Sequence, residues 1–309
     1  MFAKTGFAPD QSWTRSLGQG LILRATEQPD SPVLDRFLEG YDRAFVLPNE
    51  REETQGFRAC LSINPVARHC FGRTHREMVM VVEDERTGNV VGGANFLATR
   101  VNHPPIGHPP TAVALNYLYV EAAERGRGLA RLLKDAVGTL ANAAVEIPED
   151  ACPPAIFIEQ NDPLALSDSD YATDSQHSGV DQVDRLEIWA RLGARVVDFP
   201  YVQPALSAGQ SSDEGLTYAV LNFPSAVIDA CYFAAHLESF FGISVLKGQD
   251  LAIDPVASRQ LATLAAMAQR GTPVTLLPMA PAIAALRALP SRPVGESFRH
   301  FARTVAGDD

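Results

Sequence analysis

The sequence predicts an α/β fold, built on a mixed sheet that helices cover. Residues 111–120 are a largely apolar run rich in β-forming side chains, which predicts a buried strand. Residues 129–140 follow at once and place leucine, alanine and valine at the spacing of one helical face. Shorter strand and helix patterns continue on both sides of this pair. The strand and helix at residues 111–144 therefore form the centre of the predicted domain.

A turn rich in glycine and arginine, residues 125–130 (RGRGLA), joins this strand to its helix. The first N–H groups of a helix have no partner within it, so they point at whatever occupies the turn. These groups and the helix dipole favour an anion, and glycine admits a phosphate without a Cβ in the way. Positive charge around the turn comes from Arg125, Arg127, Arg131 and Lys134. The turn predicts a diphosphate site, although an ordinary connection with solvated arginines is the alternative.

The spacing within the turn separates several kinds of phosphate loop. A nucleotide triphosphate loop needs Lys and Ser or Thr after its second glycine, where Leu129 and Ala130 stand. The dinucleotide fingerprint needs three glycines. Arg125, Gly128 and Ala130 instead match, in register, the pattern Arg or Gln, two residues, Gly, one residue, Gly or Ala. This pattern resembles the acetyl-coenzyme A loop of the GNAT family of N-acetyltransferases.

The resemblance to the GNAT family covers residues 20–222 and includes the order of strands and helices. It implies the GNAT acyltransferase fold, acetyl-coenzyme A as co-substrate and no metal. Residues 118–120 resemble the strand of that family that splays from its neighbour, so that its backbone pairs with the pantetheine arm. The residues implied to bind the co-substrate are Leu118, Tyr119, Val120, Arg125, Gly126, Arg127, Gly128, Leu129, Ala130 and Asn161.

The other elements are predicted in chain order. Residues 1–19 have little periodicity and form an N-terminal arm. Ser31 followed by proline marks a helix start. The 20–222 domain then contains strands at 21–25, 78–82, 90–98, 155–158, 196–197 and 216–221, helices at 33–45, 51–61 and 183–192, and a loop at 167–179. Residues 223–309 form a helical C-terminal extension with helices at 225–241, 254–270 and 280–289, and a loosely held tail from 295. This extension is an appendage packed on the sheet, a lid or an arm of a homodimer.

Composition limits the partners of the chain. The net charge is −11, and no Lys or Arg occurs between Lys134 and Arg185. An acidic surface argues against nucleic acid and favours a cationic acceptor such as an amine, unless these charges only solvate a loop. The four cysteines lack paired spacing and the apolar stretch 219–246 is too polar to span a bilayer, so we expect a cytoplasmic protein without a membrane partner.

The resemblance also bears on the general acid. Many GNAT members carry a tyrosine three residues before the position of Leu192, where it protonates the departing thiolate. Trp189 stands there in this chain and has no transferable proton at neutral pH. Tyr171, Tyr201 or solvent could act instead. We take Tyr201 as the candidate, with a packing role as its alternative.

A general base is needed because an amine is protonated near pH 7 and must lose a proton before it attacks. Glu159 ends the strand at 155–158 and is the first candidate, with an ordered water as the other proton acceptor; the alternative for Glu159 is an exposed strand-end acid. Glu121 is a weaker candidate. Asn116 stands within the central strand, where some relatives have a glutamate, so that base is absent.

The predicted activity is transfer of the acetyl group of acetyl-coenzyme A to a small-molecule or peptide amine by direct attack, with the N–H of Val120 or a neighbour as oxyanion donor. The cluster of Cys60, His69, Cys70 and His75 does not have the spacing of a structural zinc site. Two other functions stay open. One is a coenzyme A-binding protein without transferase activity, and the other is an interaction module that acts through its C-terminal helices.

Overall fold

The computed structural model describes residues 2–5, 12–45, 51–67, 70–148, 150–207 and 209–307. The chain divides into two compact units. Unit 1 consists of Met1–His103, Pro109–Pro154 and Ser239–Asp250; unit 2 consists of Pro104–His108, Ala155–Glu238 and Leu251–Asp309. The predicted boundary at residue 222 does not coincide with this division.

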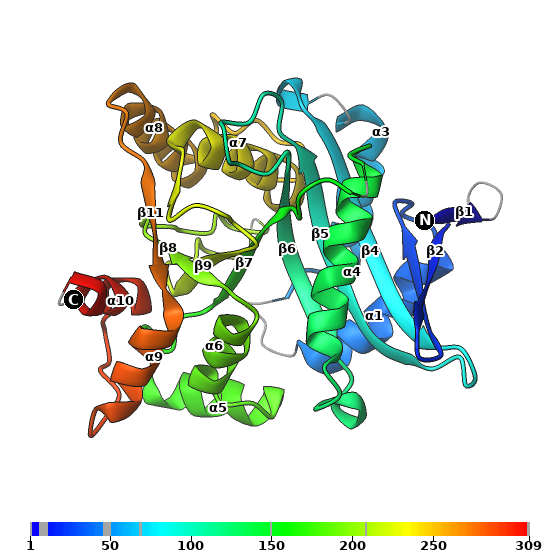
Figure 1. Ribbon diagram of the computed structural model, residues 1–309, viewed down its shortest axis with the longest axis horizontal. Helices are drawn as coiled ribbons and strands as arrows, with labels where there is room; N and C mark the ends of the chain where they lie inside the picture. The colour runs from blue at the N-terminus through cyan, green and yellow to red at the C-terminus, as the bar shows by residue number, and fades with distance from the viewer. Residues whose placement is uncertain are drawn as a thin grey trace. The chain divides into compact units, whose positions relative to one another are not determined.

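Unit 1 is built on an antiparallel sheet with the strand order β1-β2-β3-β4-β5-β6 (Figure 1). Its strands are β1 Ala3–Thr5, β2 Ser12–Gly18, β3 Leu21–Thr26, β4 Thr74–Asp84, β5 Val90–Arg100 and β6 Thr111–Val120. The three long strands β4, β5 and β6 are largely apolar on both faces, because helices cover them from both sides, but they also bury a few polar side chains.

The helices of unit 1 are α1 Pro32–Ala44, α2 Thr54–Ser62, the single turn α3 Asn64–Ala67 and α4 Leu129–Ala144. The predicted start of α1 is confirmed, since Ser31 Oγ accepts a hydrogen bond from Val33 N–H at 3.3 Å. Consecutive residues of a strand face opposite sides of its sheet. Accordingly Gly92 faces Leu133 of α4, whereas Gly93 faces the ring of Tyr119, which packs with α1.

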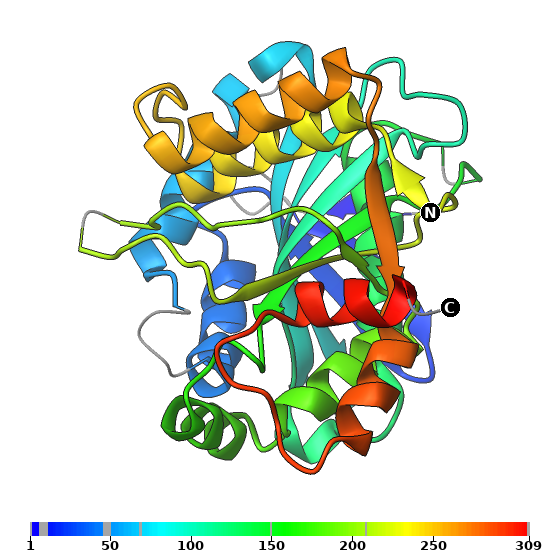
Figure 2. The same cartoon turned by 90° about the vertical axis from the view of Figure 1, so that its left-hand side faces the viewer.

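Unit 2 holds strands in the order β7-β9-β8-β11-β10, each pair antiparallel. They are β7 Ala155–Asn161, β8 Arg195–Val197, β9 Leu216–Leu221, β10 Val227–Ile228 and β11 Val274–Pro278. Its helices are α5 Asp168–Ser178, α6 Gln182–Arg191, most of α7 Ala230–Phe240, α8 Pro255–Gln269, α9 Met279–Ala288 and α10 Phe298–Gly307. Figure 2 shows α10 beside β11 and α9. The predicted α/β class, a sheet covered by helices, is confirmed.

Two segments predicted to lack regular structure are ordered elements. Residues 12–18 of the expected arm form β2, which pairs with β3. The expected loop at 167–179 is α5, capped where Ser167 Oγ accepts from Asp170 N–H at 3.1 Å and ended by Gly179 in the left-handed conformation. This helix buries only Asp174, so its sequence carries no apolar stripe that would have indicated it.

The C-terminal region differs from the prediction of a helical extension with a loose tail. The three predicted helices are present as α7, α8 and α9, but β11 lies between the last two and pairs with β8. The tail forms α10, whose Phe298 and Ala302 are buried. The last residues of α7 and the following π-helical turn η4, Phe241–Val245, belong to unit 1. The region is therefore divided between the units.

Candidate functional site

Strand β6 carries a β-bulge at Asn116. Asn95 of β5 pairs with Tyr117, and the next residue, Phe96, pairs with Leu115, so Asn116 is left out of the ladder. A bulge bends its strand and redirects the side chains around it. Leu118, the first of the residues predicted to bind pantetheine, is half-buried and lies two positions beyond this irregularity.

The backbone at the end of β6 points away from β5 at the predicted oxyanion donor. Glu121 N–H donates to the Val91 carbonyl at 3.0 Å, and N–H directions alternate along a strand. Val120 N–H therefore points away from β5, and its carbonyl, on the same side, accepts from Arg125 Nε at 3.5 Å. Tyr119 differs, since its side chain is buried and its hydroxyl donates to the Phe37 carbonyl at 3.2 Å.

The turn after β6 has the geometry of an anion cradle. A 3-10 turn, η3 Ala122–Glu124, leads into Gly126 and Gly128, whose φ angles are +80° and +76°. Gly128 is the N-cap of α4, and no side chain caps the helix. The first N–H groups of α4 thus face the turn. A Cβ at either glycine would meet no heavy atom within 4 Å, so the turn borders open space.

The cations of the turn are not equivalent. Arg125, Arg127 and Arg131 are exposed, and Arg127 forms an ion pair with Glu124. Lys134 is buried and ion-paired with Asp135, so it adds little positive charge for a ligand at the turn. The prediction that Lys134 strengthens the cradle is therefore wrong.

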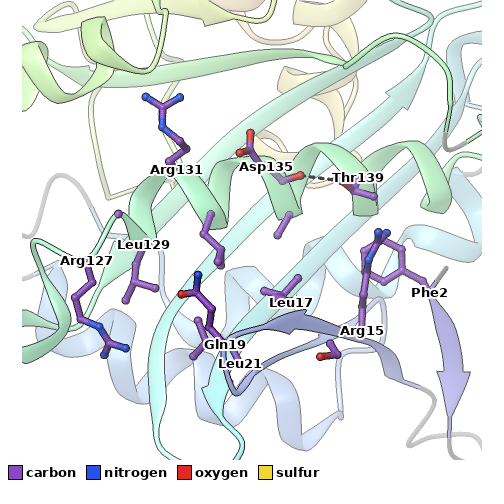
Figure 3. Close-up of a pocket in the computed structure, with 14 residues that line it drawn as sticks. Phe2, Arg15, Leu17, Gln19, Leu21, Arg127, Leu129, Arg131, Asp135 and Thr139 are labelled. Carbon is purple, nitrogen blue, oxygen red and sulfur yellow. Dashed lines mark hydrogen bonds between the residues drawn. The ribbon is translucent and has the colours of Figure 1, made fainter.

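A cavity of about 480 Å³ adjoins the turn, between α4 and the hairpin of β2 and β3 (Figure 3). It shares Arg127, Gly128 and Leu129 with the turn. Its other lining residues include the apolar Leu17 and Leu132 and the cations Arg15 and Arg131. Small-molecule sites have volumes of this order. Because residues 1–19 were predicted to be an arm, the hairpin wall was missed.

The structure brings the two predicted catalytic residues together within unit 2. Tyr201, on the segment between β8 and β9, donates its hydroxyl to Glu159 Oε1. Strand β7 continues to Asn161, so Glu159 lies within the strand, paired with Tyr218 of β9, and not at the strand end that the sequence predicted. Gln203 Nε2 donates to the second carboxylate oxygen at 3.2 Å. Gln203 is held by two backbone hydrogen bonds of 2.9 Å to Asp213. The carboxylate therefore has a donor on each oxygen.

The pKa values of the carboxyl and of the two neighbouring phenols in this cluster are all raised. Burial raises the pKa of Glu159 to about 7, against the opposing effect of the Tyr201 hydrogen bond. Burial, and then the charge of Glu159, hold the pKa of Tyr201 well above its usual value. Tyr218, stacked on Tyr201 with ring centroids 4.2 Å apart, has its pKa raised for the same reasons. Near pH 7 the carboxyl can therefore exchange a proton, and the resting Tyr201 is protonated.

The other predicted candidates have structural partners. Tyr171 donates its hydroxyl to Asp181 Oδ2 at 2.7 Å, which joins α5 to the N-cap of α6. Glu121 forms an ion pair of 2.6 Å with Arg43. Asn161, predicted to bind co-substrate, donates to Asp174 Oδ2 at 3.3 Å. Trp189 is half-buried on α6.

Sequence reasoning missed Glu77, a carboxylate on β4 with only 1% of its surface exposed. Burial raises its pKa to about 7. The side-chain amide of Asn64 binds the main chain of Glu77 twice: its oxygen accepts from Glu77 N–H at 2.8 Å, and its nitrogen donates to the Glu77 carbonyl at 2.9 Å. A charged residue at the start of an unbroken apolar run was the signal that could have indicated it.

Within the described residues, no three His, Cys, Asp or Glu side chains are placed to hold a metal ion. Of the four residues considered for zinc, His69 and the side chain of Cys70 lie outside the described part. Cys60 is buried beside the Ile243 and Ser244 carbonyls, and His75 is buried against Thr99 at 3.2 Å. Among the helices described, none has the length and apolar character needed to cross a membrane.

Comparison with known proteins adds structural likeness only. No family model matches the sequence, and no curated protein sequence matches it significantly. Solved structures similar to this chain include GNAT acetyltransferases. One is the ribosomal-protein-S18-alanine N-acetyltransferase from Escherichia coli, at 12% identity and a TM-score of 0.37, covering 67% of this chain and 96% of that one.

Two further solved structures are similar at the same low level. A tandem GNAT protein of the clavulanic acid biosynthesis pathway is 16% identical at a TM-score of 0.36, covering 59% of this chain and 46% of that one. An aminoglycoside acetyltransferase from an uncultured soil metagenomic sample is 15% identical at a TM-score of 0.32, and the match covers 53% of this chain and 89% of that one. Likenesses of this strength are too weak to carry an inference about activity or substrate.

Proposed function

We propose that this chain is an N-acetyltransferase of the GNAT type that uses acetyl-coenzyme A. The observation that carries the proposal is the turn at the start of α4. An uncapped helix N-terminus, two left-handed glycines beside open space and exposed arginines together suit a diphosphate. Neither the nucleotide triphosphate loop nor the dinucleotide fingerprint fits residues 125–130.

The rest of the co-substrate is assigned from the same unit. The backbone of Leu118 and Val120, directed away from β5, would pair with the amides of the pantetheine arm. The cavity beside α4 has room for the nucleotide end, with Arg15 and Arg131 near its phosphate. This part of the proposal rests on the charge of the cavity and on the residues it shares with the turn.

The reaction is a direct acyl transfer. The lone pair of a neutral amine attacks the thioester carbonyl, the C–N bond forms, and the C–S bond breaks with departure of the coenzyme A thiolate. The Val120 N–H would stabilise the oxyanion of the intermediate. After attack the nitrogen loses a proton to Glu159 and the thiolate takes a proton from Tyr201; the protonated Glu159 then returns its proton to the Tyr201 oxygen through their hydrogen bond. Those two roles are proposed from the chemistry of the unit 2 cluster alone.

The acceptor is proposed to be an amine on a small molecule or a peptide. The net charge of −11 favours a cationic acceptor over a nucleic acid. A first screen should therefore contain both small-molecule amines and peptide amines.

We expect coenzyme A release when the protein is mixed with acetyl-coenzyme A and a panel of primary amines. The product is best separated by chromatography, because Cys152 and Cys231 are exposed and would react with thiol reagents. Acceptor-dependent release supports the transferase. Tight binding of coenzyme A with no release for any amine would support a coenzyme A-binding protein without transferase activity instead.

Arg131→Glu is expected to weaken coenzyme A binding about tenfold, or ~1.4 kcal/mol, because it reverses one charge of the cavity next to the turn. Arg86→Glu, which reverses an exposed charge in the turn between β4 and β5, is the matched control. Calorimetric titration with coenzyme A measures both. Equal affinities for the two variants would remove the cavity from the proposed site.

A further inference from the structure

A row of polar side chains crosses three neighbouring strands beneath the β6 bulge. Glu77 lies on β4, Asn95 on β5 and Asn116 on β6 (Figure 1). Asn95 Nδ2 donates to Glu77 Oε1 at 2.7 Å, and Asn116 Nδ2 donates to the same oxygen at 3.1 Å. Asn116 Nδ2 also donates to Asn95 Oδ1 at 3.0 Å. The three side chains form one connected network.

The carboxylate fixes which way each amide points. Asn95 Nδ2 faces two acceptors, Glu77 Oε1 and the Met78 carbonyl at 3.0 Å, so its amide cannot be turned over without losing both bonds. Asn95 Oδ1 is then directed at Asn116. Asn116 in turn faces two oxygens and must present its nitrogen to them. The orientation of Asn116 thus depends on Glu77.

This orientation leaves the carbonyl oxygen of Asn116 as an acceptor at the bulge. Asn116 Oδ1 is shielded from water and receives no hydrogen bond from any side chain or backbone group in the described ranges. Buried amide oxygens are nearly always paired, so this oxygen at the bulge is an acceptor that a donor group could satisfy. The group must carry a proton to donate.

The charges around the network favour a cation as that group. Ser244 Oγ donates to Glu77 Oε2 at 2.8 Å, which completes the network without neutralising the carboxylate. Lys247 lies close enough to influence Glu77, but its ammonium forms an ion pair of 2.7 Å with Glu52. Glu77, Glu52 and Lys247 together carry one net negative charge when both carboxylates are ionised. Its field attracts an ammonium and repels an acid.

Aromatic rings flank the same position. The half-buried Tyr117, adjacent to Asn116, lies against Tyr41, Phe45 and Phe57 with ring centroids 4.9 to 5.5 Å apart. Tyr41 and Phe57 are buried in the core, so the partly buried rings of Tyr117 and Phe45 are the ones that can offer a face to an alkylammonium group. The polar row, the surplus charge and the rings all suit an organic amine.

We propose that Asn116 Oδ1 accepts a hydrogen bond from the amino group of the acyl acceptor and that Glu77 is a positioning residue for Asn116. This inference rests on the proposed acetyl transfer. A carbonyl oxygen that holds one N–H of the neutral amine leaves the nitrogen lone pair free for attack. The acceptor class is a primary amine, which keeps a second N–H for the proton that is lost after attack.

Three substitutions separate positioning from simple packing. Asn116→Leu removes the acceptor oxygen at similar volume. Glu77→Leu removes the group that orients Asn116. Glu77→Gln keeps an oxygen for the two asparagines and a nitrogen that can donate to Ser244 Oγ, so it preserves the network. Asn89→Leu, at an exposed asparagine of unit 1, is the matched control.

The probe is whichever of spermidine, kanamycin and an alanyl dipeptide the wild type acetylates fastest. Asn116→Leu and Glu77→Leu are expected to raise its KM tenfold to hundredfold, and Glu77→Gln less than threefold. A double variant that combines Glu77→Leu with Asn116→Leu should have the same KM as Asn116→Leu alone, because Glu77 acts through Asn116. Thermal melting of each variant reports folding, and the Kd for coenzyme A should stay within twofold of wild type.

An unchanged KM in folded Asn116→Leu overturns this inference and leaves acetyl transfer standing. So does a Glu77→Gln variant as impaired as Glu77→Leu, because the network would then not be what orients Asn116. If the wild type binds coenzyme A but acetylates none of the three amines, or does not bind it, both this inference and the proposed function fail.

Discussion

Gly128→Asp is expected to abolish coenzyme A binding while the protein stays folded. Gly128 has a φ of +76° and borders open space, so the new side chain meets no neighbour. Aspartate and asparagine tolerate left-handed backbone better than other non-glycine residues. The carboxylate would occupy the position of the diphosphate and repel it, with the loss of charge-assisted hydrogen bonds worth about 3 kcal/mol or more in total, a hundredfold or greater loss of affinity.

Gly128→Asn is the control for this variant, because it has the same shape and backbone tolerance without the charge. Its affinity for coenzyme A should fall about tenfold, between wild type and Gly128→Asp. Calorimetric titration measures affinity, and circular dichroism melting shows whether the variants fold. Wild-type affinity in Gly128→Asp would mean that the diphosphate does not bind at this turn.

Glu159→Gln is expected to lower kcat by a factor of about 100 to 1,000, the usual contribution of a general base. The amide keeps the hydrogen bond from Tyr201 but cannot take the proton of the acceptor. Coenzyme A affinity should not change. Glu214→Gln, at an exposed glutamate of the same unit, is the control. Turnover of Glu159→Gln equal to that of the control would exclude the proposed base.

The pH dependence gives this second prediction a sharper form. The carboxyl of Glu159 has a pKa of about 7, and only its ionised form accepts a proton. In the wild type kcat should therefore rise about tenfold per pH unit below pH 7 and level off above it. In Glu159→Gln kcat should not rise with pH in this range. If the rise persists in the variant, it belongs to another titrating group.

Stability supplies an independent check on the same pKa. The usual value for glutamate is 4.5, so the folded state holds its proton more tightly than the unfolded state between pH 4.5 and 7. The wild type therefore loses stability as the pH rises through this window. Glu159→Gln should be more stable than the wild type in urea at pH 8 and equal to it at pH 4.

The centre of the fold could be predicted because its signals are local. The strand β6, the glycine turn and the helix α4 lie within 34 consecutive residues. Each has its own local signal: an apolar run of β-forming residues, a pair of glycines, and apolar residues at helical spacing. Helices α5 and α10 were missed for different reasons. α5 buries a single residue, and α10 follows a segment rich in proline and arginine that resembled a tail.

The candidate site could be predicted only where neighbours in sequence are neighbours in space. Glu159 was indicated because the sequence predicted a strand end there, although β7 continues to Asn161. Its contact with Tyr201 spans 42 positions, and Gln203, which also binds the carboxylate, is held by its bridge to Asp213. The link from Glu77 to Asn116 depends on the register of three strands and on a bulge, which no local pattern specifies. The roles of these residues in binding and catalysis stay predictions.

The most direct test is to titrate the wild-type protein by calorimetry with coenzyme A and with pantetheine, which lacks the diphosphate and nucleotide. If the turn at the start of α4 holds the diphosphate, coenzyme A should bind at least a hundredfold more tightly than pantetheine. Equal affinity for the two compounds, or no binding of coenzyme A, would contradict that assignment and the function built on it.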